Sequence, residues 1–325
     1  MGGTAIVLVQ AMLPGCAPPD ATAEESAAGG GEGESTEDPV VGNADELRSR
    51  VDGYNLSEPL VDLELPKKLA EISGLVAMED GTLACIQDER GTVYLIDGAS
   101  GEVSSRVKFA GKDDFEAICR AGSRWFALIS DGEIVELEET DGKEGFQLEE
   151  LDSIEIDLPH AEFEALAHDA LGDRLLLVPK DRADSKARSK DDVLVYALGL
   201  GRLAGDPEIA LELSVKRIEE SAAERRLPLP TRTTKSGKKK SDLRLRASDL
   251  AVHPATGHLY LLSGPDRTLL VLDRDGALIG SAVFPASLLP QPEGVAFAED
   301  GRLILTSEGV DGGRARLLAF PLLPR

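Results

Sequence analysis

Short apolar runs alternate with turn residues along most of this chain. The runs Thr82–Ile86, Thr92–Ile96 and Val103–Phe109 are rich in Val, Leu and Ile, and the turns between them contain Gly. Short β-rich runs joined by Gly-containing turns indicate strands connected by hairpins. Thirty-three Gly and eighteen Pro spread along the chain also favour many turns over long helices. The pattern predicts an all-β fold.

One short phrase occurs five times and sets the period of the fold. Its third positions are Ser73, Glu116, Glu164, Ser248 and Glu293, at separations of 43, 48, 84 and 45 residues. Each phrase is followed by turns and further β-rich runs. Four strands in about 45 residues are typical of a β-propeller blade. The sequence therefore predicts a single β-propeller over residues 57–325.

The 84-residue interval leaves two blade counts open. It has room for two blades, or for one blade and an insertion. Residues 216–246 contain eleven Lys and Arg against four acids, and they show no hairpin alternation. We therefore predict five four-stranded blades with a basic insertion at about 216–246, and six blades are the alternative.

The two ends of the propeller are expected to meet in one blade. The last repeat supplies only three strands before Arg325. The segment Leu60–Pro66 precedes the first repeat at the place where an outer strand would lie. We predict that this N-terminal strand completes the last blade.

The amino terminus has the features of a bacterial lipoprotein. Residues 5–13 are apolar and too few to span a bilayer as a helix, and Leu13–Cys16 resembles a lipobox. We expect a signal peptide at 1–15, lipidation of Cys16, and a disordered acidic linker at 16–56. The propeller would then be extracytoplasmic and anchored to a bacterial membrane. No Lys or Arg precedes the apolar run, which leaves open whether Met1 is the true start.

Composition narrows the class of partner. The chain has 35 Lys and Arg and 59 Asp and Glu, a net charge of −24. This balance excludes a broad nucleic-acid surface and favours cations. The basic insertion is either a solvated loop or a dock for an anionic partner such as phospholipid head groups or lipopolysaccharide. Three Cys exclude a disulfide framework; Cys85 and Cys119 fall in neighbouring blades, and we interpret them as free thiols, with a disulfide as the alternative.

The repeated acid is the main candidate for chemistry. Inner strands of a propeller surround its axis, so equivalent residues converge. Three of the five positions are Glu116, Glu164 and Glu293. Converging carboxylates repel unless a cation neutralises them, and oxygen ligands suit Ca²⁺ before Mg²⁺. The alternative is that each Glu caps strand ends by accepting backbone N–H groups. The remaining expected channel-lining residues are Ser73, Ser248 and Asp249.

Other polar residues are weaker candidates. His160 precedes Glu162 and Glu164 and is the candidate general base, with an exposed loop histidine as the alternative; turn packing is sufficient to explain His253 and His258. Acidic residues at turns are expected to rim the ligand face, although ordinary turn chemistry also explains them. These rim candidates are Asp88, Glu89, Asp131, Asp181 and Glu308.

Five phrases together resemble the SdiA-regulated (YjiK-like) family of bacterial β-propellers. They are Glu71–Leu75, Gln87–Glu89, Asp114–Ile118, Ser248–Tyr260 and Gln291–Phe297. The resemblance implies a periplasmic or surface-exposed propeller, commonly described as calcium-binding, whose activity is largely unassigned. Positions 116, 164 and 293 match the family's Glu-Gly motif, although Ala117 and Ala165 replace the Gly in two of them.

The sequence thus predicts a membrane-tethered, monomeric propeller that binds Ca²⁺ in or at its channel. We expect it to act as a ligand-binding or scaffold module, with a protein or a small anionic ligand held through Ca²⁺. The alternative is a calcium-dependent hydrolase of lactonase or phosphoesterase type that uses the same site.

Overall fold

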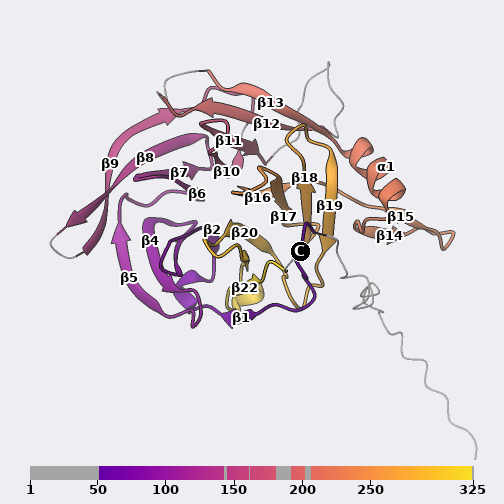
Figure 1. The fold of residues 1–325 in the computed structure, drawn as a ribbon, viewed down its shortest axis with the longest axis horizontal. Helices are drawn as coiled ribbons and strands as arrows, with labels where there is room; N and C mark the ends of the chain where they lie inside the picture. Colours follow the sequence, from indigo (N-terminus) through magenta and orange to yellow (C-terminus); the bar gives the residue numbers. More distant parts are fainter. Residues whose placement is uncertain (1–50, 143–144, 161, 181–191, 202–205, 324–325) are drawn as a thin grey trace, which may run out of the picture. The chain divides into compact units, whose positions relative to one another are not determined.

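Five four-stranded antiparallel sheets surround a common axis, which confirms the five-bladed β-propeller (Figure 1). The computed structural model describes residues 51–142, 145–160, 162–180, 192–201 and 206–323. The inner strands β2, β6, β10, β16 and β20 contact one another in a closed ring. Within the described ranges, no helix is long and apolar enough to cross a membrane. The predicted signal peptide and Cys16 lie outside these residues.

The blades follow one another along the chain, each counted outward from the axis. The first contains β2 (Ile72–Ala77), β3 (Thr82–Gln87), β4 (Arg90–Asp97) and β5 (Val103–Lys108). The second contains β6 (Phe115–Ala121), β7 (Arg124–Ile129), β8 (Glu133–Gly142) and β9 (Gly145–Glu155). The third contains β10 (Phe163–Asp169), β11 (Arg174–Pro179), β12 (Asp192–Gly199) and β13 (Glu208–Ser214).

The fourth blade follows the insertion, and the fifth uses both ends of the described chain. The fourth contains β16 (Ala247–Val252), β17 (Leu259–Ser263), β18 (Thr268–Leu272) and β19 (Leu278–Val283). The fifth contains β20 (Pro292–Phe297), β21 (Leu303–Ser307), β22 (Arg316–Phe320) and β1 (Val61–Glu64). Two 3₁₀ turns, η1 (Lys67–Leu69) and η2 (Val310–Gly312), lie between strands.

Strand β1 closes the ring as its outermost strand, as predicted. It pairs antiparallel with β22, so that Val61 lies opposite Ala319 and Glu64 opposite Arg316. The Arg316 guanidinium donates to both oxygens of Asp62 at 2.7 Å. Leu65, directly after β1, is fully buried and packs in the cluster between the first and fifth blades. The propeller is thus held shut by pairing between residues far apart in sequence.

Residues from Val51 onward, the first that the structure describes, already pack in the propeller, before the start predicted at Ser57. Val51, Tyr54 and Leu56 are buried in the cluster between the fourth and fifth blades. The Tyr54 hydroxyl donates to the Gly301 carbonyl at 2.7 Å. The last part of the predicted linker, 51–56, therefore belongs to the propeller, because its apolar side chains find partners that the sequence around them does not reveal.

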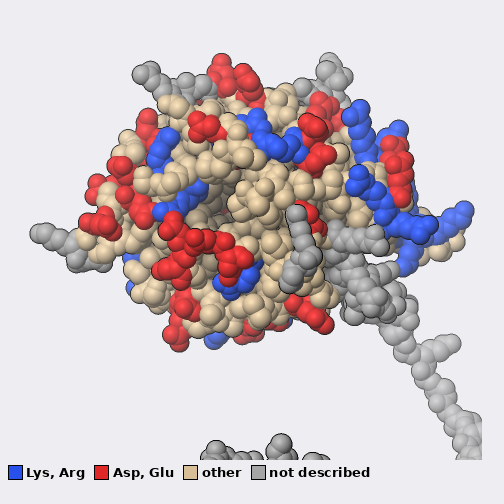
Figure 2. Space-filling view, viewed as in Figure 1, with Lys and Arg blue, Asp and Glu red and all other residues tan. Residues whose placement is uncertain are grey.

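The basic insertion contains a helix and a hairpin beside the ring (Figure 1). Helix α1 (Val215–Arg225) buries Val215, Ile218 and Ala222 against the cluster shared by the third and fourth blades. Strands β14 (Thr231–Thr233) and β15 (Lys239–Ser241) form the hairpin. Its short polar strands carry no apolar alternation, so the sequence did not predict it. Lys and Arg gather over α1, β14 and β15, while acids are spread over much of the remaining visible face (Figure 2).

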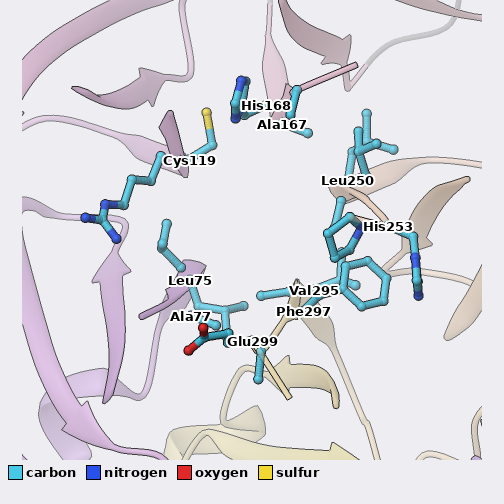
Figure 3. Close-up of a pocket in the computed structure, with 18 of the residues that line it drawn as sticks. Leu75, Ala77, Cys119, Ala167, His168, Leu250, His253, Val295, Phe297 and Glu299 are labelled. Carbon is cyan, nitrogen blue, oxygen red and sulfur yellow. The ribbon is translucent and has the colours of Figure 1, made fainter. Parts of the chain in front are cut away.

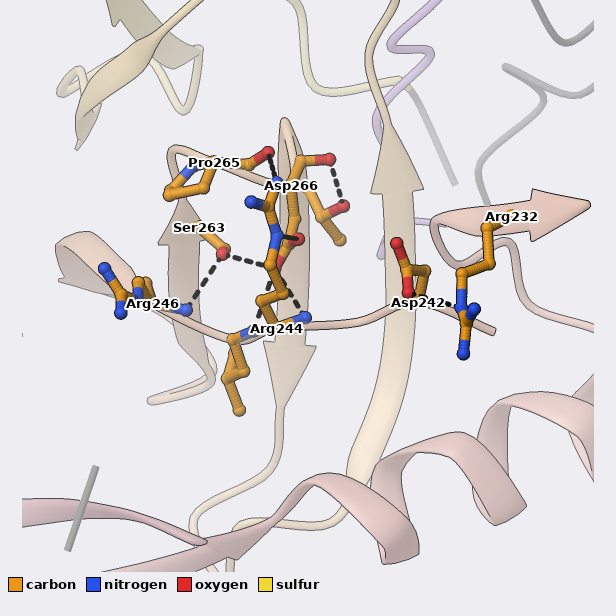
Figure 4. Close-up of polar contacts among 9 residues, drawn as sticks. Arg232, Asp242, Arg244, Arg246, Ser263, Pro265 and Asp266 are labelled. Atoms are coloured by element: carbon orange, nitrogen blue, oxygen red, sulfur yellow. Dashed lines mark hydrogen bonds and ion pairs between the residues drawn. The ribbon is translucent and has the colours of Figure 1, made fainter. Parts of the chain in front are cut away.

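A buried carboxylate anchors the segment that leads from the hairpin into the fourth blade. Asp266 accepts hydrogen bonds from the backbone N–H groups of Arg244 and Leu245 at 3.0 and 2.8 Å (Figure 4). The Ser263 hydroxyl donates to the same carboxylate at 2.9 Å, and the Arg244 guanidinium at 3.1 Å. A separate pair, Arg232 and Asp242, lies at the hairpin itself. The insertion is therefore fixed to the blade at its root.

A second buried carboxylate joins the third and fourth blades. Both oxygens of Asp169 accept hydrogen bonds from Arg274, and one also from Arg174, at 2.8–2.9 Å. Burial alone would raise the pKa of Asp169, but the two guanidinium groups hold it at about 2. Charge-assisted pairs of this kind are among the stronger hydrogen bonds in proteins. The end of β10 is thus tied to the turn that follows β18 in the fourth blade.

Candidate functional site

Each of the five inner strands contains a β-bulge at the repeated third position. The pairing of β6 with β7 passes from Phe115 to Ala117 and leaves Glu116 without a partner residue. The same register shift skips the third position of the other four phrases: Ser73, Glu164, Ser248 and Glu293. A bulge turns the side chain of the extra residue away from the regular alternation. The repeat in the sequence therefore encodes five re-aimed side chains at one end of the channel, which we call the acidic mouth.

Glu116 has the clearest electrostatic signature at the acidic mouth. Burial raises its pKa to about 8, with further contributions from the charges of Glu164 and Asp114. Burial raises the pKa of a carboxyl because the charged form loses hydration, and nearby anions add to the effect. Glu116 therefore carries a substantial fraction of protonated carboxyl at neutral pH when no cation is bound.

Glu164 has a cation beside it. The Lys180 ammonium contacts Glu164 directly and lies 3.5 Å from Glu162. Burial raises the pKa of Glu164, and the hydrogen bond and charge of Lys180 oppose that rise. The pKa of Lys180 is raised in turn, because its carboxylate partners outweigh its desolvation. Lys180 thus acts as a built-in counter-ion for one of the three repeated acids.

The fifth blade adds two carboxylates without such a partner. Burial raises the pKa of Glu293 well above its usual value, and the charges of Glu308, Glu164 and Glu116 contribute. Glu308 has a pKa raised to about 7, first by burial and then by Asp88 and other acids. The Gln291 amide donates to Glu308. These pKa shifts indicate that carboxylates from several blades are close enough to repel one another electrostatically.

The first blade contributes polar atoms that are buried without hydrogen bonds. Among the described residues, Ser73 Oγ, Gln87 Oε1 and Asp88 Oδ1 have no hydrogen-bond partner. Gln87 lies opposite Ile72, next to the Ser73 bulge. Burial raises the pKa of Asp88 to about 6, with Glu71 and Glu89 adding to it. Buried oxygens without partners are uncommon in folded proteins, and an ion or water is one explanation for them.

The side chains of the acidic mouth are not arranged as a preformed metal site. Within the described part of the chain, no group of three or more His, Cys, Asp or Glu residues lies as it would around a metal ion. The alternative role in capping strand ends is not supported for the three repeated acids either. No backbone N–H of the described residues donates to Glu116, Glu164 or Glu293. Ser248, the equivalent residue of the fourth blade, does contact a neighbouring strand, because its Oγ donates to the Pro292 carbonyl at 2.8 Å.

The remaining sequence candidates fall in different places. Asp131 accepts the Glu133 N–H in an exposed turn, which is ordinary turn chemistry, and Glu89 is exposed beside Asp88. Asp181 lies outside the described residues. Asp249 is buried between the fourth and fifth blades, where it accepts the backbone N–H groups of Leu250 and Val295 at 2.8 and 2.7 Å.

The histidine and cysteine candidates are engaged in packing. His160 hydrogen-bonds the Tyr196 hydroxyl at 2.8 Å, on the third strand of its blade and away from the axis. His253 Nδ1 accepts from Ala255 and Thr256 in its turn, and His258 pairs with Asp52 at 2.7 Å. Cys85 and Cys119 are both free and buried.

Sequence reasoning noted the turns that contain Gln87 and Lys180 but gave neither residue a role of its own in the acidic mouth. Gln87 ends β3 and Lys180 directly follows β11, each next to an acid predicted as a rim residue. The signal was available in part, because β3 and β11 pair with the inner strands whose bulges carry Ser73 and Glu164.

Residues 216–310 match the model of the SdiA-regulated family. The predicted resemblance is therefore confirmed. The SdiA-regulated match covers the basic insertion, the fourth blade and the inner strands of the fifth, and so includes Glu293 and Glu308. No curated protein matches the sequence.

Solved structures share the propeller fold at low sequence identity. A glutaminyl cyclase from Myxococcus xanthus is 12% identical with a TM-score of 0.50, over 82% of this chain and 97% of that chain. A PQQ-bound aldose sugar dehydrogenase from Streptomyces coelicolor is 13% identical with a TM-score of 0.48, over 81% and 97%. A luciferin-regenerating enzyme is 13% identical with a TM-score of 0.47, over 81% and 95%. Identities this low show the fold alone.

Proposed function

We propose that the acidic mouth binds a divalent cation, Ca²⁺ before Mg²⁺, and that the propeller acts as a cation-dependent binding module. The observation that carries the proposal is the set of five inner-strand bulges that re-aim Glu116, Glu164 and Glu293 toward a shared, partly buried field of negative charge. Bulges are common beside functional sites because they direct single side chains.

The donor chemistry of the acidic mouth suits a hard cation. Ca²⁺ takes six to eight oxygen ligands from carboxylates, amides, hydroxyls and water, in flexible geometry. Carboxylates are available from Glu116, Glu293 and Glu308. The unpartnered oxygens of Ser73 and Gln87 lie in the adjoining blade. The bound cation would offset the repulsion that now raises the carboxyl pKa values and would let the long Glu side chains turn inward.

Lys180 sets a limit on this cation site. Its ammonium already pairs with Glu164, so a divalent ion either displaces it or uses the carboxylates that it does not contact. We propose the second arrangement, with Glu116, Glu293 and Glu308 as ligands and the Glu164–Lys180 pair left at the edge. A ligand with anionic oxygens could then complete the coordination shell of the cation.

The same proposal places the module outside the cytoplasm, held to a membrane through lipidated Cys16.

The experiment is calorimetric titration of the protein with Ca²⁺ at pH 8. The double substitution Glu116→Gln and Glu293→Gln keeps side-chain size and removes two negative charges. We expect it to weaken Ca²⁺ binding by about tenfold or more, the loss of about 1.4 kcal/mol or more of binding free energy. Its melting temperature without Ca²⁺ should not fall, because two mutually repelling buried carboxylates are removed.

Glu299→Gln is the matched control. Glu299 is an exposed glutamate that follows β20, at the strand end opposite Glu293. Its substitution removes one negative charge from the blade that contains Glu293 and should leave Ca²⁺ affinity within about twofold. Equal losses in the control and the double variant would show that net charge, rather than the acidic mouth, attracts the ion. An unchanged affinity in the double variant would exclude the site.

A further inference from the structure

A large cavity opens at the end of the channel opposite the acidic mouth. Its volume is about 740 Å³, within the usual range for small-molecule sites. The lining includes two consecutive residues from each of the five inner strands, two and three positions after the bulge. We call this cavity the funnel. Figure 3 shows side chains from all around the ring arranged about its empty centre.

The side chains of those ten positions explain why space remains. The first position of each pair is aliphatic and nearly fully buried: Leu75, Ile118, Leu166, Leu250 and Val295. The second position is small in four of the five blades, where it is Cys119, Ala167, Ala251 and Ala296. In the first blade it is Val76. Large aliphatic groups close the channel near its middle, and small groups leave the part beyond unfilled. The cavity therefore follows from the residue types that recur at these positions of the inner strands.

Burial shifts the pKa of three ionisable groups that line the funnel toward the neutral form, and the lining also includes Glu79 and Glu299. Burial raises the pKa of Asp249 well above its usual value and raises that of the Cys119 thiol. Burial lowers the pKa of His168, so its imidazole is neutral at physiological pH. The Arg120 guanidinium is engaged by Glu139 at 2.9 Å and lies over the Trp125 ring. The charge on Arg120 is thus already compensated by the protein itself.

Two further features point to an occupant. Cys119 lines the funnel and is only 7% exposed (Figure 3). No hydrogen bond to its sulfur exists among the described residues, so a thiol donor is buried without an acceptor. On the other side, the Phe297 ring lies 4.7 Å from His253 and 4.8 Å from Tyr260, between ring centroids. This packing holds Phe297 as part of a rigid aromatic wall.

We propose that the funnel binds a neutral, largely apolar organic molecule that carries one hydrogen-bond acceptor. Its apolar body would fill the space above the aliphatic residues and pack against Phe297. Its acceptor atom would accept a hydrogen bond from the Cys119 thiol. An anionic ligand is disfavoured because Glu79 and Glu299 belong to the lining and the Arg120 guanidinium is already paired with Glu139, and burying an unpaired ion is costly. This site is separate from the acidic mouth and needs no cation.

Two dyes with one aromatic body test the proposal. 6-Propionyl-2-(dimethylamino)naphthalene is neutral and carries one ketone oxygen as acceptor, and 6-(dimethylamino)naphthalene-2-carboxylate replaces that ketone with a carboxylate on the same skeleton. Fluorescence titration of the intact protein should show saturable 1:1 binding of the neutral dye. The anionic dye should bind about tenfold more weakly or worse. Equal affinity for both dyes, or no binding of the neutral one, would overturn the proposal.

Substitutions locate the dye. Cys119→Phe should fill the funnel and weaken binding of the neutral dye by about tenfold or more. Ala251→Leu, at a partly exposed wall position, gives a second blocking variant if Cys119→Phe does not fold. Leu151→Phe, at an exposed position of the outer strand β9 and outside the funnel, is the matched control and should leave dye binding unchanged. Unchanged binding in a folded blocking variant would place the dye elsewhere and contradict the assignment, whatever the Ca²⁺ titrations show.

Discussion

Deletion of residues 1–65 is expected to abolish the stable propeller, whereas deletion of residues 1–50 should leave it folded. The longer deletion removes β1 and the backbone pairing with β22 that closes the ring. It also removes Val51, Tyr54, Leu56 and Leu65, all of them at most 3% exposed. Burial of a large apolar side chain contributes about 1.5–3 kcal/mol, so four of them approach the whole stability of a typical domain.

Thermal unfolding followed by circular dichroism, with size-exclusion chromatography, measures this effect. We expect the 51–325 chain to unfold cooperatively and to elute as a monomer, and the 66–325 chain to aggregate through the exposed edge of β22. A chain that begins at Ser57 should show an intermediate melting temperature, because it keeps β1 but loses three buried side chains. Equal melting temperatures for the 51–325 and 66–325 chains would refute closure by β1.

Ca²⁺ affinity is expected to fall steeply as the pH is lowered from 8 to 6. Glu116 has a pKa of about 8 and Glu308 of about 7 without a cation. The cation binds the ionised carboxylates, so protons must leave first. A single group with a pKa of about 8 weakens binding by about 50-fold over this range, and Glu308 adds to the effect. Titration in buffers of different ionisation enthalpy will count the protons released.

The cation-free protein should respond to pH in the opposite sense. A carboxyl whose pKa is raised by folding stabilises the fold at low pH, and this contribution is lost as the pH rises through the folded-state pKa. The stability of the cation-free fold should therefore fall as the pH rises from 6 to 8 and the carboxyl groups of the acidic mouth lose their protons. Ca²⁺ should restore that stability. Glu116→Gln should flatten the pH dependence of Ca²⁺ affinity. An affinity that is equal at pH 6 and pH 8 would contradict the shared role of these carboxylates.

The repeat could be predicted from the sequence because each copy is defined by the types of neighbouring residues in one short segment. Glu116, Glu164 and Glu293 recur at blade spacing, and Gly-containing turns separate the strand runs, so blade count and ring closure followed. The bulges were not readable, because a register shift depends on how two strands pair rather than on either strand alone. The field around Glu116 also depends on Lys180 and Asp88, which belong to other strands.

Other features escaped prediction for equally physical reasons. Tyr54 lies in a segment of linker-like composition, and the partners that make its burial favourable, such as Tyr260, Phe297 and the Gly301 carbonyl, are far away in the sequence. The hairpin of β14 and β15 has polar, mostly exposed strands, so no alternation marked it. The funnel arises from small side chains such as Ala167 and Ala251, and what they leave empty is visible only once five blades are assembled.

The most direct test of the cation-binding role is a crystal structure of residues 51–325 grown with Ca²⁺, with anomalous scattering to identify the ion. The account predicts one Ca²⁺ at the acidic mouth, with carboxylate oxygens of Glu116 and Glu293 about 2.3–2.6 Å away. It also predicts that the Lys180–Glu164 pair stays in place. Absence of an anomalous peak at the acidic mouth in millimolar Ca²⁺ at pH 8 would contradict it.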